Sequence, residues 1–300
     1  MNAVLLDRVL DRLGVGRDIE CNLDGLRRVY RVWCTSVPFD NTAKLIAIGN
    51  RSPGLLPGID ATEFFERFLT HGAGGTCWPT SNALFTLLSA MGFDVRRAAG
   101  SMRDTGIVSH GTTKVHIDDI DWLADSSMLT NEPLSLTDEP FIGEDPLVPV
   151  EVHKNRGDHI VWWDLPPNES YIPCRLLHDD VSHDFYIERY EASRIRSPFN
   201  ERIYARRNLG DRMLIITGNR RLLKTTDGVD DSNLSDSELY EILADEIGIS
   251  TGLLDELRKT PAWDASFIPA PPAAGAASAL LQEMPDFSRR SRPSAGSPST

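Results

Sequence analysis

The spacing of apolar residues changes near residue 95, and this change limits what the chain can fold into. Before it, apolar residues recur every three or four positions, which predicts helices over Ala3–Leu13, Leu23–Thr35 and Ala61–Leu69. From about Val95 to Ile216 the chain has short runs of β-branched and aromatic residues separated by turn formers, which predict strands. The clearest runs are Thr112–Ile117, Ile160–Trp163, Phe185–Tyr190 and Met213–Thr217. The sequence therefore predicts an α+β protein in which a helical bundle precedes a β-rich region.

The C-terminal part begins with a strong helix signal and ends in a biased composition. Ser235 and Glu238 form a capping box ahead of an apolar stripe, and Gly248 stands where that helix would end. After about Ile268 the chain is rich in Pro, Ala and Ser. Because such a composition cannot bury a core, we predict a disordered tail over residues 269–300.

The charge balance is acidic, with a formal net charge of −13 at pH 7. Nucleic acids and anionic membranes attract basic surfaces, so neither is expected as a partner. An anionic co-substrate would need a local exception, and the pairs Arg206-Arg207 and Arg220-Arg221 are interpreted as solvated surface. The N-terminus lacks the apolar stretch of a signal peptide, and no window is apolar enough to span a bilayer. We therefore expect a cytoplasmic protein.

Cys77 is the most informative of the four cysteines, the others being Cys21, Cys34 and Cys174. Their wide spacing predicts neither a zinc site nor a disulfide framework. Cys77 follows the glycine-rich loop 72–75 and begins an apolar helical pattern that ends at Gly92. A thiol at a helix N-terminus meets unpaired amides and the positive end of the helix dipole, which favour a thiolate and can bind an oxyanion. The alternative is a small buried cysteine that packs at a helix end.

A candidate base lies on a predicted hairpin further along the chain. If residues 118–119 form its two-residue turn, Asp125 is a diagonal neighbour of His110 on the same face, about 7 Å away at Cβ. The carboxylate would hold the imidazole tautomer and stabilise its protonated form. His116 shares the face but pairs with Asp121 beside the turn, so it is the weaker candidate base. In the alternative interpretation, His110 is a surface strand residue and Asp125 only forms a turn.

Taken together, these residues resemble the arylamine N-acetyltransferase family. Its members carry a G-G-x-C nucleophile, a strand histidine and an aspartate about fifteen residues later, as Cys77, His110 and Asp125 do here. The segment Val37–Asn41 resembles the family's V-P-F-[DE]-N segment, and Ser197–Phe199 resembles its S-P-F segment. The similarity covers roughly residues 5–265.

The resemblance implies a fold and an order of segments. It implies a helical bundle over residues 1–94 that carries the nucleophile, and a central β-barrel-like domain over 95–212 that carries the histidine and the aspartate. An α/β lid over 213–268 would follow, and then the tail over 269–300. The core would be cysteine-protease-like, with the nucleophile on a helix and the base on a sheet.

The resemblance also implies an N-acyltransferase with a ping-pong mechanism. Cys77, with His110 as its base and Asp125 orienting that base, would take an acyl group from acetyl-coenzyme A or another acyl thioester. A small-molecule amine, hydrazine or hydroxylamine would then accept the group from the acyl-Cys77 intermediate. The thioester would be a co-substrate, so neither a permanently bound cofactor nor a metal is expected. The sequence leaves the oligomeric state open.

The chain departs from the family pattern beside the nucleophile and after the aspartate. Ala73 and Pro79 replace the family's Arg before G-G-x-C and its Glu after the cysteine, which indicates the joint loss of an ion pair. Ser126–Leu129 replaces a G-F-G loop that shapes the acceptor and cofactor pocket. Acyl transfer is therefore better supported than an arylamine acceptor or a coenzyme A donor. A carrier-protein thioester, or the formation of an intramolecular amide, stays open.

Two other functions fit parts of the pattern. A transglutaminase-like or hydrolytic thiol enzyme shares a G-x-C before a helix and a His followed by Trp and Asp, and Trp122 supplies that Trp here. A catalytically inactive homologue would explain the departures, but a degenerating site should lose its triad early. The segments Val37–Asn41 and Ser197–Phe199 favour the acetyltransferase interpretation.

Overall fold

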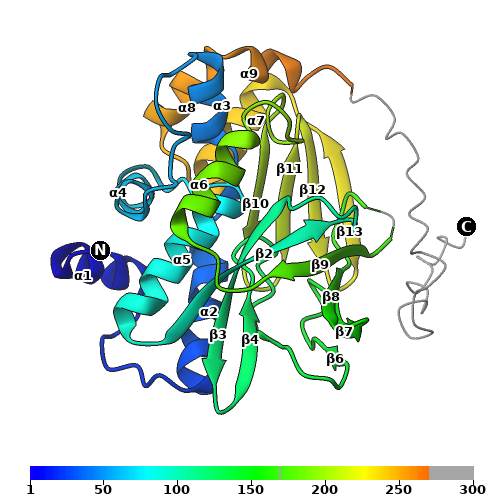
Figure 1. Cartoon of the computed structure of the whole chain (residues 1–300). Coiled ribbons are helices and arrows are strands. Elements are labelled where there is room, and N and C mark those ends of the chain that lie inside the picture. The colour runs from blue at the N-terminus through cyan, green and yellow to red at the C-terminus, as the bar shows by residue number, and fades with distance from the viewer. Residues whose placement is uncertain (169, 270–300) are drawn as a thin grey trace, which may run out of the picture.

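The N-terminal part of the molecule is helical, as predicted (Figure 1). The computed structural model describes residues 1–168 and 170–269, so the predicted tail lies, from residue 270, outside the described residues. The predicted helices are α1 (Ala3–Leu13), α2 (Leu23–Ser36), α4 (Ala61–His71) and α5 (Cys77–Met91). A further helix, α3 (Thr42–Gly49), was not predicted. Buried side chains such as Leu10, Trp33 and Phe65 join these helices to the sheet that follows.

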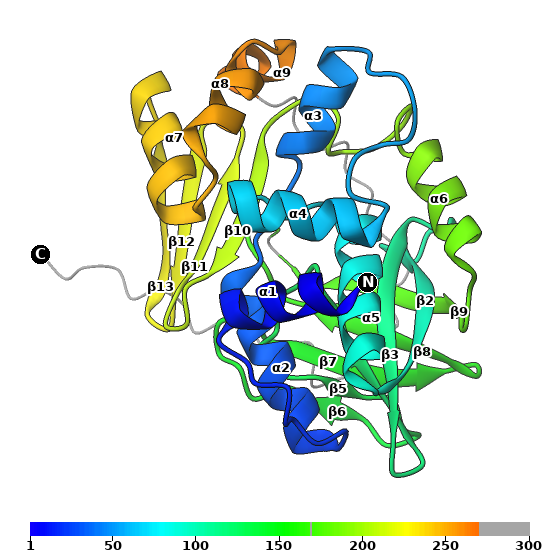
Figure 2. The same cartoon turned by 90° about the vertical axis from the view of Figure 1, so that its left-hand side faces the viewer.

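An eight-stranded antiparallel sheet curls into a nearly closed, barrel-like layer against α5 (Figure 2). Its spatial order is β5-β4-β3-β2-β9-β8-β7-β6. The strands are β2 (Asp94–Met102), β3 (His110–Ile117), β4 (Ile120–Ala124), β5 (Leu134–Ser135), β6 (Phe141–Ile142), β7 (Val150–Asn155), β8 (Asp158–Trp163) and β9 (Ile172–His178). Helix α5 packs directly on β2 and β3, so the helix and the strand that carry the candidate residues share one interface.

A second, five-stranded sheet has the order β1-β10-β11-β12-β13. Its strands are β1 (Phe39–Asp40), β10 (Tyr204–Asn208), β11 (Met213–Thr217), β12 (Arg220–Thr225) and β13 (Gly228–Asn233). The elements that follow are α7 (Asp236–Ile242), the π-helical turn η1 (Leu243–Ile247), α8 (Thr251–Arg258) and α9 (Pro261–Ala265). Leu214 and Ile216 on the sheet pack with Leu239 and Leu257 on these helices to form a separate apolar core. Strand β1 comes from between α2 and α3, so this sheet reaches back to the N-terminal helices.

The run Phe185–Tyr190 was predicted as a strand, and this prediction is wrong. The run lies inside helix α6 (His183–Ala192), which begins where the Ser182 side chain accepts a hydrogen bond from the amide of Phe185. Tyr186 and Tyr190, four residues apart, are the buried residues of this helix. Their aromatic rings have high strand propensity, but burial of one helical face overrides that preference.

The hairpin of β3 and β4 has the predicted register. Asp118 and Asp119 form its turn with positive φ angles of 50° and 61°, the left-handed conformation that a two-residue hairpin turn requires. The ladder runs from Ile117 opposite Ile120 to Thr113 opposite Ala124, and it ends there. Asp125 therefore stands just beyond the last paired residue of β4.

The helices of residues 1–168 and 170–269 include none that is both long enough and apolar enough to cross a lipid bilayer.

Candidate active site

Cys77 is the first residue of α5, at the end of the glycine-rich loop. Gly72 ends α4 in the left-handed conformation, and a Cβ on Gly74 would collide with the carbonyl oxygen of Pro38. The preceding residue, Thr76, is extended and makes no side-chain hydrogen bond to the helix, so no cap occupies the first amides of α5. The Cys77 side chain is buried, with 8% of its surface exposed.

Asp40 holds the glycine-rich loop in place. Its buried carboxylate accepts hydrogen bonds from the amide of Gly74 at 2.7 Å and from the amide of Thr42 at 2.9 Å. The Asp40 amide in turn donates to the carbonyl oxygen of Gly75 at 3.1 Å. Burial raises the pKa of Asp40, although the two amides that it accepts act in the opposite direction. The fourth residue of the V-P-F-D-N segment therefore positions the loop that leads to Cys77.

Asn41 connects this loop to the S-P-F segment, which is more than 150 residues away in the sequence. Its side-chain amide donates to the carbonyl oxygens of Phe199 at 3.1 Å and Arg202 at 2.7 Å, and its oxygen accepts from the amide of Tyr204 at 2.9 Å. Both segments can be recognised in the sequence, but their contact cannot, because it joins residues far apart along the chain. Both segments therefore serve to fix the residues around α5.

The structure brings His110 and Asp125 together. Nε2 of His110 lies 2.6 Å from Oδ2 of Asp125, and the other carboxylate oxygen accepts from the amides of Ser127 at 2.9 Å and Met128 at 3.0 Å. Burial would raise the pKa of Asp125, but the charge and hydrogen bond of His110, together with the two amides, hold it below its ordinary value. One oxygen of the Asp125 carboxylate therefore accepts from the turn amides, and the other bonds to the His110 imidazole.

His110 is buried, and its neighbours favour the protonated imidazole. Only 3% of its surface is exposed. Burial alone would lower the pKa of His110, but the charge and hydrogen bond of Asp125, with a further contribution from Cys77, raise it to about 10. Asp125 occupies Nε2, so Nδ1 is the ring nitrogen that takes no part in this pair. The Cys77 sulfur lies 3.9 Å from the carbonyl oxygen of Ser109, the residue before this histidine.

A chain of hydroxyl groups joins the Asp125 loop to the start of α5. Ser126 donates to Oγ1 of Thr80 at 2.9 Å, and Thr80 donates to the carbonyl oxygen of Thr76 at 2.9 Å. Ser81 lies 2.9 Å from the Ser126 hydroxyl and donates to the carbonyl oxygen of Gly111 at 2.7 Å. Sequence reasoning missed these contacts, because small hydroxyl residues inside a helix carry no positional signal of their own.

Apolar packing surrounds the two residues near Cys77, Ala73 and Pro79, at which the chain departs from the family pattern. Ala73 is fully buried in the apolar core of the second sheet, beside Leu45 and Ile203. Pro79 packs so closely on Gly75 that a Cβ added there would lie 2.9 Å from its ring. Apolar contacts therefore take the place of the ion pair that the family resemblance implied.

The interpretation of Arg206-Arg207 as solvated surface is wrong. Arg206 is 4% exposed, its guanidinium lies 5.2 Å above the ring of Phe39, and it donates to the carbonyl oxygen of Ser127. Arg207 is half-buried and donates to the carbonyl oxygen of Ile247 at 2.8 Å. Both faces of β10 are covered, one by the Asp125 loop and the other by η1. The loop that replaces G-F-G is thus held by a buried arginine.

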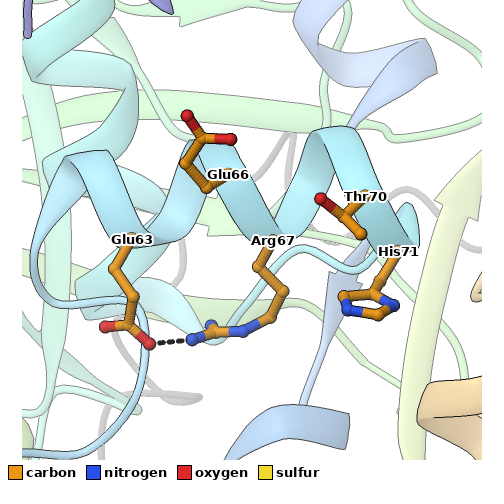
Figure 3. A pocket seen from close by; sticks show the side chains of 5 residues that line it. All are labelled: Glu63, Glu66, Arg67, Thr70 and His71. Carbon is orange, nitrogen blue, oxygen red and sulfur yellow. Dashed lines mark hydrogen bonds and ion pairs between the residues drawn. The ribbon is translucent and has the colours of Figure 1, made fainter.

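The structure also has a surface hollow of about 310 Å³ that contains none of the three candidate residues (Figure 3). Glu63, Glu66, Arg67, Thr70 and His71 of α4 line it. Arg67 pairs with Glu63, and Nδ1 of His71 lies 2.7 Å from the hydroxyl of Ser250. Within residues 1–168 and 170–269, no group of three His, Cys, Asp or Glu side chains could hold a metal ion.

Solved structures of other proteins share this fold, and a family model matches most of the chain. The model of the N-acetyltransferase family matches residues 22–255. The arylamine N-acetyltransferase from Salmonella typhimurium matches with a TM-score of 0.71 at 18% identity, over 86% of this chain and 98% of that one. An arylamine N-acetyltransferase from Mycobacterium smegmatis gives 0.73 at 17% identity, over 88% and 100%. One from Bacillus cereus, described as having a Cys-His-Glu catalytic triad, gives 0.69 at 15% identity, over 83% and 100%.

One curated relative is named a synthase and not an acetyltransferase. The Proansamycin X synthase of Amycolatopsis mediterranei (strain S699) is 26% identical over 131 residues, which are 42% of this chain and 48% of that protein. The match thus spans about half the length of that relative.

The fold and the family match define an enzyme that is an N-acyltransferase. The chain belongs to the N-acetyltransferase family, whose model covers most of its length. The resemblance to arylamine N-acetyltransferases and the predicted fold class are therefore confirmed. Family membership implies an acyl donor and a small-molecule acceptor, and it favours acyl transfer over the transglutaminase-like or hydrolytic alternative.

Proposed function

We propose that the chain transfers an acyl group, in the simplest case acetyl, from a thioester to an amine, hydrazine or hydroxylamine through an acyl-Cys77 intermediate. The observation that carries this proposal is the buried pair of His110 and Asp125, 2.6 Å apart, beside a cysteine at an uncapped helix start. The Bacillus cereus relative, described as having a Cys-His-Glu catalytic triad, supports a Cys-His-carboxylate set in this fold.

In the first half-reaction, the Cys77 thiolate attacks the carbonyl carbon of the thioester. The first amides of α5 face the negative charge that develops on the carbonyl oxygen. The bond between the carbonyl carbon and the donor sulfur then breaks, and the departing thiolate takes the proton that His110 carries and leaves as the thiol. The product is acyl-Cys77 with a neutral imidazole.

In the second half-reaction, the acceptor nitrogen attacks the acyl carbon. His110, now neutral, takes the proton that this nitrogen loses, and the Cys77 thiolate leaves. The imidazolium is restored, and the Asp125 carboxylate stabilises it. The same histidine thus serves both halves. The mechanism predicts ping-pong kinetics, because the donor thiol leaves before the acceptor reacts with acyl-Cys77.

This mechanism predicts that Cys77→Ala abolishes acyl transfer while the protein stays folded. Turnover is measured with acetyl-coenzyme A, other acyl thioesters and an amine acceptor, and folding by circular dichroism. Cys21→Ala is the matched control, because Cys21 is exposed and lies outside the candidate site. Acyl transfer that survives in the Cys77 variant would rule the mechanism out.

A second candidate is amide synthesis from a carrier-protein thioester. It is favoured by the Ser126–Leu129 loop, which departs from the family's G-F-G, and the partial match is to a protein named a synthase and not an acetyltransferase. A panel that pairs the same acyl group with coenzyme A and with a carrier protein separates the two candidates. Faster acylation of Cys77 by the carrier-protein thioester would favour amide synthesis.

A further inference from the structure

Lys44 is a buried cation that the proposed mechanism does not use. It lies on α3 with 3% of its surface exposed. Its Nζ donates to the hydroxyl of Ser193 at 2.9 Å, lies 3.4 Å from the carbonyl oxygen of the same residue, and stands 5.6 Å above the ring of Tyr190. Among residues 1–168 and 170–269, no carboxylate lies within ion-pair distance of it.

An unpaired ammonium in this position is unfavourable unless another charge balances it. Burial lowers the pKa of Lys44 to about 8, while the charge of Cys77 acts to raise it. On α6 and just after it, Arg194 acts to lower this pKa and Glu191 to raise it, but the Glu191 carboxylate is already bound by Arg194 and by the amide of Leu56. Cys77 is thus the negative partner that the surroundings of Lys44 leave available.

The set of Asp125, His110 and Cys77 becomes neutral in its reactive form only when Lys44 is counted with it. Asp125 carries one negative charge, His110 one positive charge and the Cys77 thiolate a second negative charge, so the reactive form of the triad has a net charge of −1 in a buried site. The charge of Cys77 also acts on three other titratable groups, those of Tyr186, Tyr190 and Cys174. Burial raises the pKa of each of these three groups, so they stay neutral at pH 7.

Lys44 faces the apolar cluster to which the nucleophile belongs. The Tyr190 ring that Lys44 faces belongs to the apolar cluster that contains Cys77 and Trp78. We propose that Lys44 is the counter-cation of the Cys77 thiolate, and that it keeps the buried Asp125, His110 and Cys77 set electrically neutral in its reactive form. The inference rests on the proposed function, because it assigns a partner to the same nucleophile.

Lys44 acts only while it is protonated. Its stabilisation of the thiolate is complete well below pH 8 and is lost as the pH rises through about 8. A variant without this charge should therefore differ most from the wild type at acidic and neutral pH, and the two should converge above pH 8.

The test is the rate at which iodoacetamide alkylates Cys77, followed by peptide mass spectrometry between pH 5 and 9. Lys44→Met and Lys44→Gln remove the charge, and Lys44→Arg keeps it. The control is Lys114→Met, since Lys114 is equally buried but pairs with Asp179 at 2.6 Å. We expect about a tenfold slower reaction at pH 6 in the Met and Gln variants, near wild-type rates in the control, and partial recovery with Arg.

The possible outcomes separate this inference from the proposed function. The pH profile of Cys77 alkylation in the wild type can differ from that of an ordinary thiol and be the same in folded Lys44→Met and Lys44→Gln proteins. This result overturns the role of Lys44 and leaves the proposed mechanism standing. If Cys77 of the wild type is alkylated with the pH profile of an ordinary thiol and the Cys77→Ala variant is active, the proposed function itself is overturned. A loss in the Met variant that Arg does not restore counts against a charge effect.

Discussion

The two sides of the candidate site are held in place by different means. On the base side, His110 and Asp125 belong to one hairpin and the turn after it, so the strand register already places them within fifteen residues of each other in the sequence and 2.6 Å apart in space. On the nucleophile side, Cys77 depends on Asp40 and Asn41, which reach across the fold to the glycine loop and the S-P-F segment. Local strand register thus brings the histidine and the carboxylate together, and long-range bonds from Tyr30 and Arg206 only support the Asp125 loop, whereas the loop before Cys77 depends on a long-range polar contact for its position.

The largest expected effect comes from breaking the base side. Asp125→Asn removes the charge that stabilises the His110 imidazolium, so we expect kcat/KM for acyl transfer to fall by about 10³-fold. The hairpin offers a matched control, because Asp121 bonds to His116 at 2.9 Å on the same strands in a half-buried pair. Asp121→Asn should change kcat/KM by less than about twofold. Equal losses in the two variants would contradict the assignment of Asp125.

The next effect comes from breaking the nucleophile side. Asp40→Ala leaves the buried amides of Gly74 and Thr42 without an acceptor, so the free energy of unfolding in urea should fall by about 2–5 kcal/mol. Asp40→Asn keeps an acceptor oxygen and should lose less. Alkylation of Cys77 should slow in the Ala variant, since the loop is no longer fixed. A destabilised variant with an unchanged alkylation rate would show that the Asp40 contacts do not position the nucleophile.

Each side of the site could be predicted from the sequence only as far as it depends on contacts between residues close together in the chain. The hairpin register came from apolar alternation and two turn residues, which are local signals. Helix α6 was missed because its aromatic residues favour strands, and only the Ser182 cap and the burial of one face decide against them. Neither the contact of Asn41 with Phe199 nor the burial of Arg206 could be predicted, because both depend on chain segments far apart in sequence.

The smallest expected effect concerns the contact between the two sides. Ser126→Ala removes the hydroxyl that joins the Asp125 loop to Thr80 of α5, so we expect a loss of about 1 kcal/mol in the free energy of unfolding. The rate of acyl transfer should fall by less than about tenfold, because each side keeps its own supports. A rate loss as large as that of Asp125→Asn would mean that the two sides are not held independently.

The most direct test of the account is the mass of the intact protein after incubation with an acyl thioester and no acceptor. We predict that the wild-type chain gains the mass of one acyl group, that peptide mapping assigns it to Cys77, and that an added amine removes it with formation of the amide. A stable gain on another residue, or no gain with any acyl-coenzyme A or carrier-protein thioester, would contradict a mechanism through acyl-Cys77.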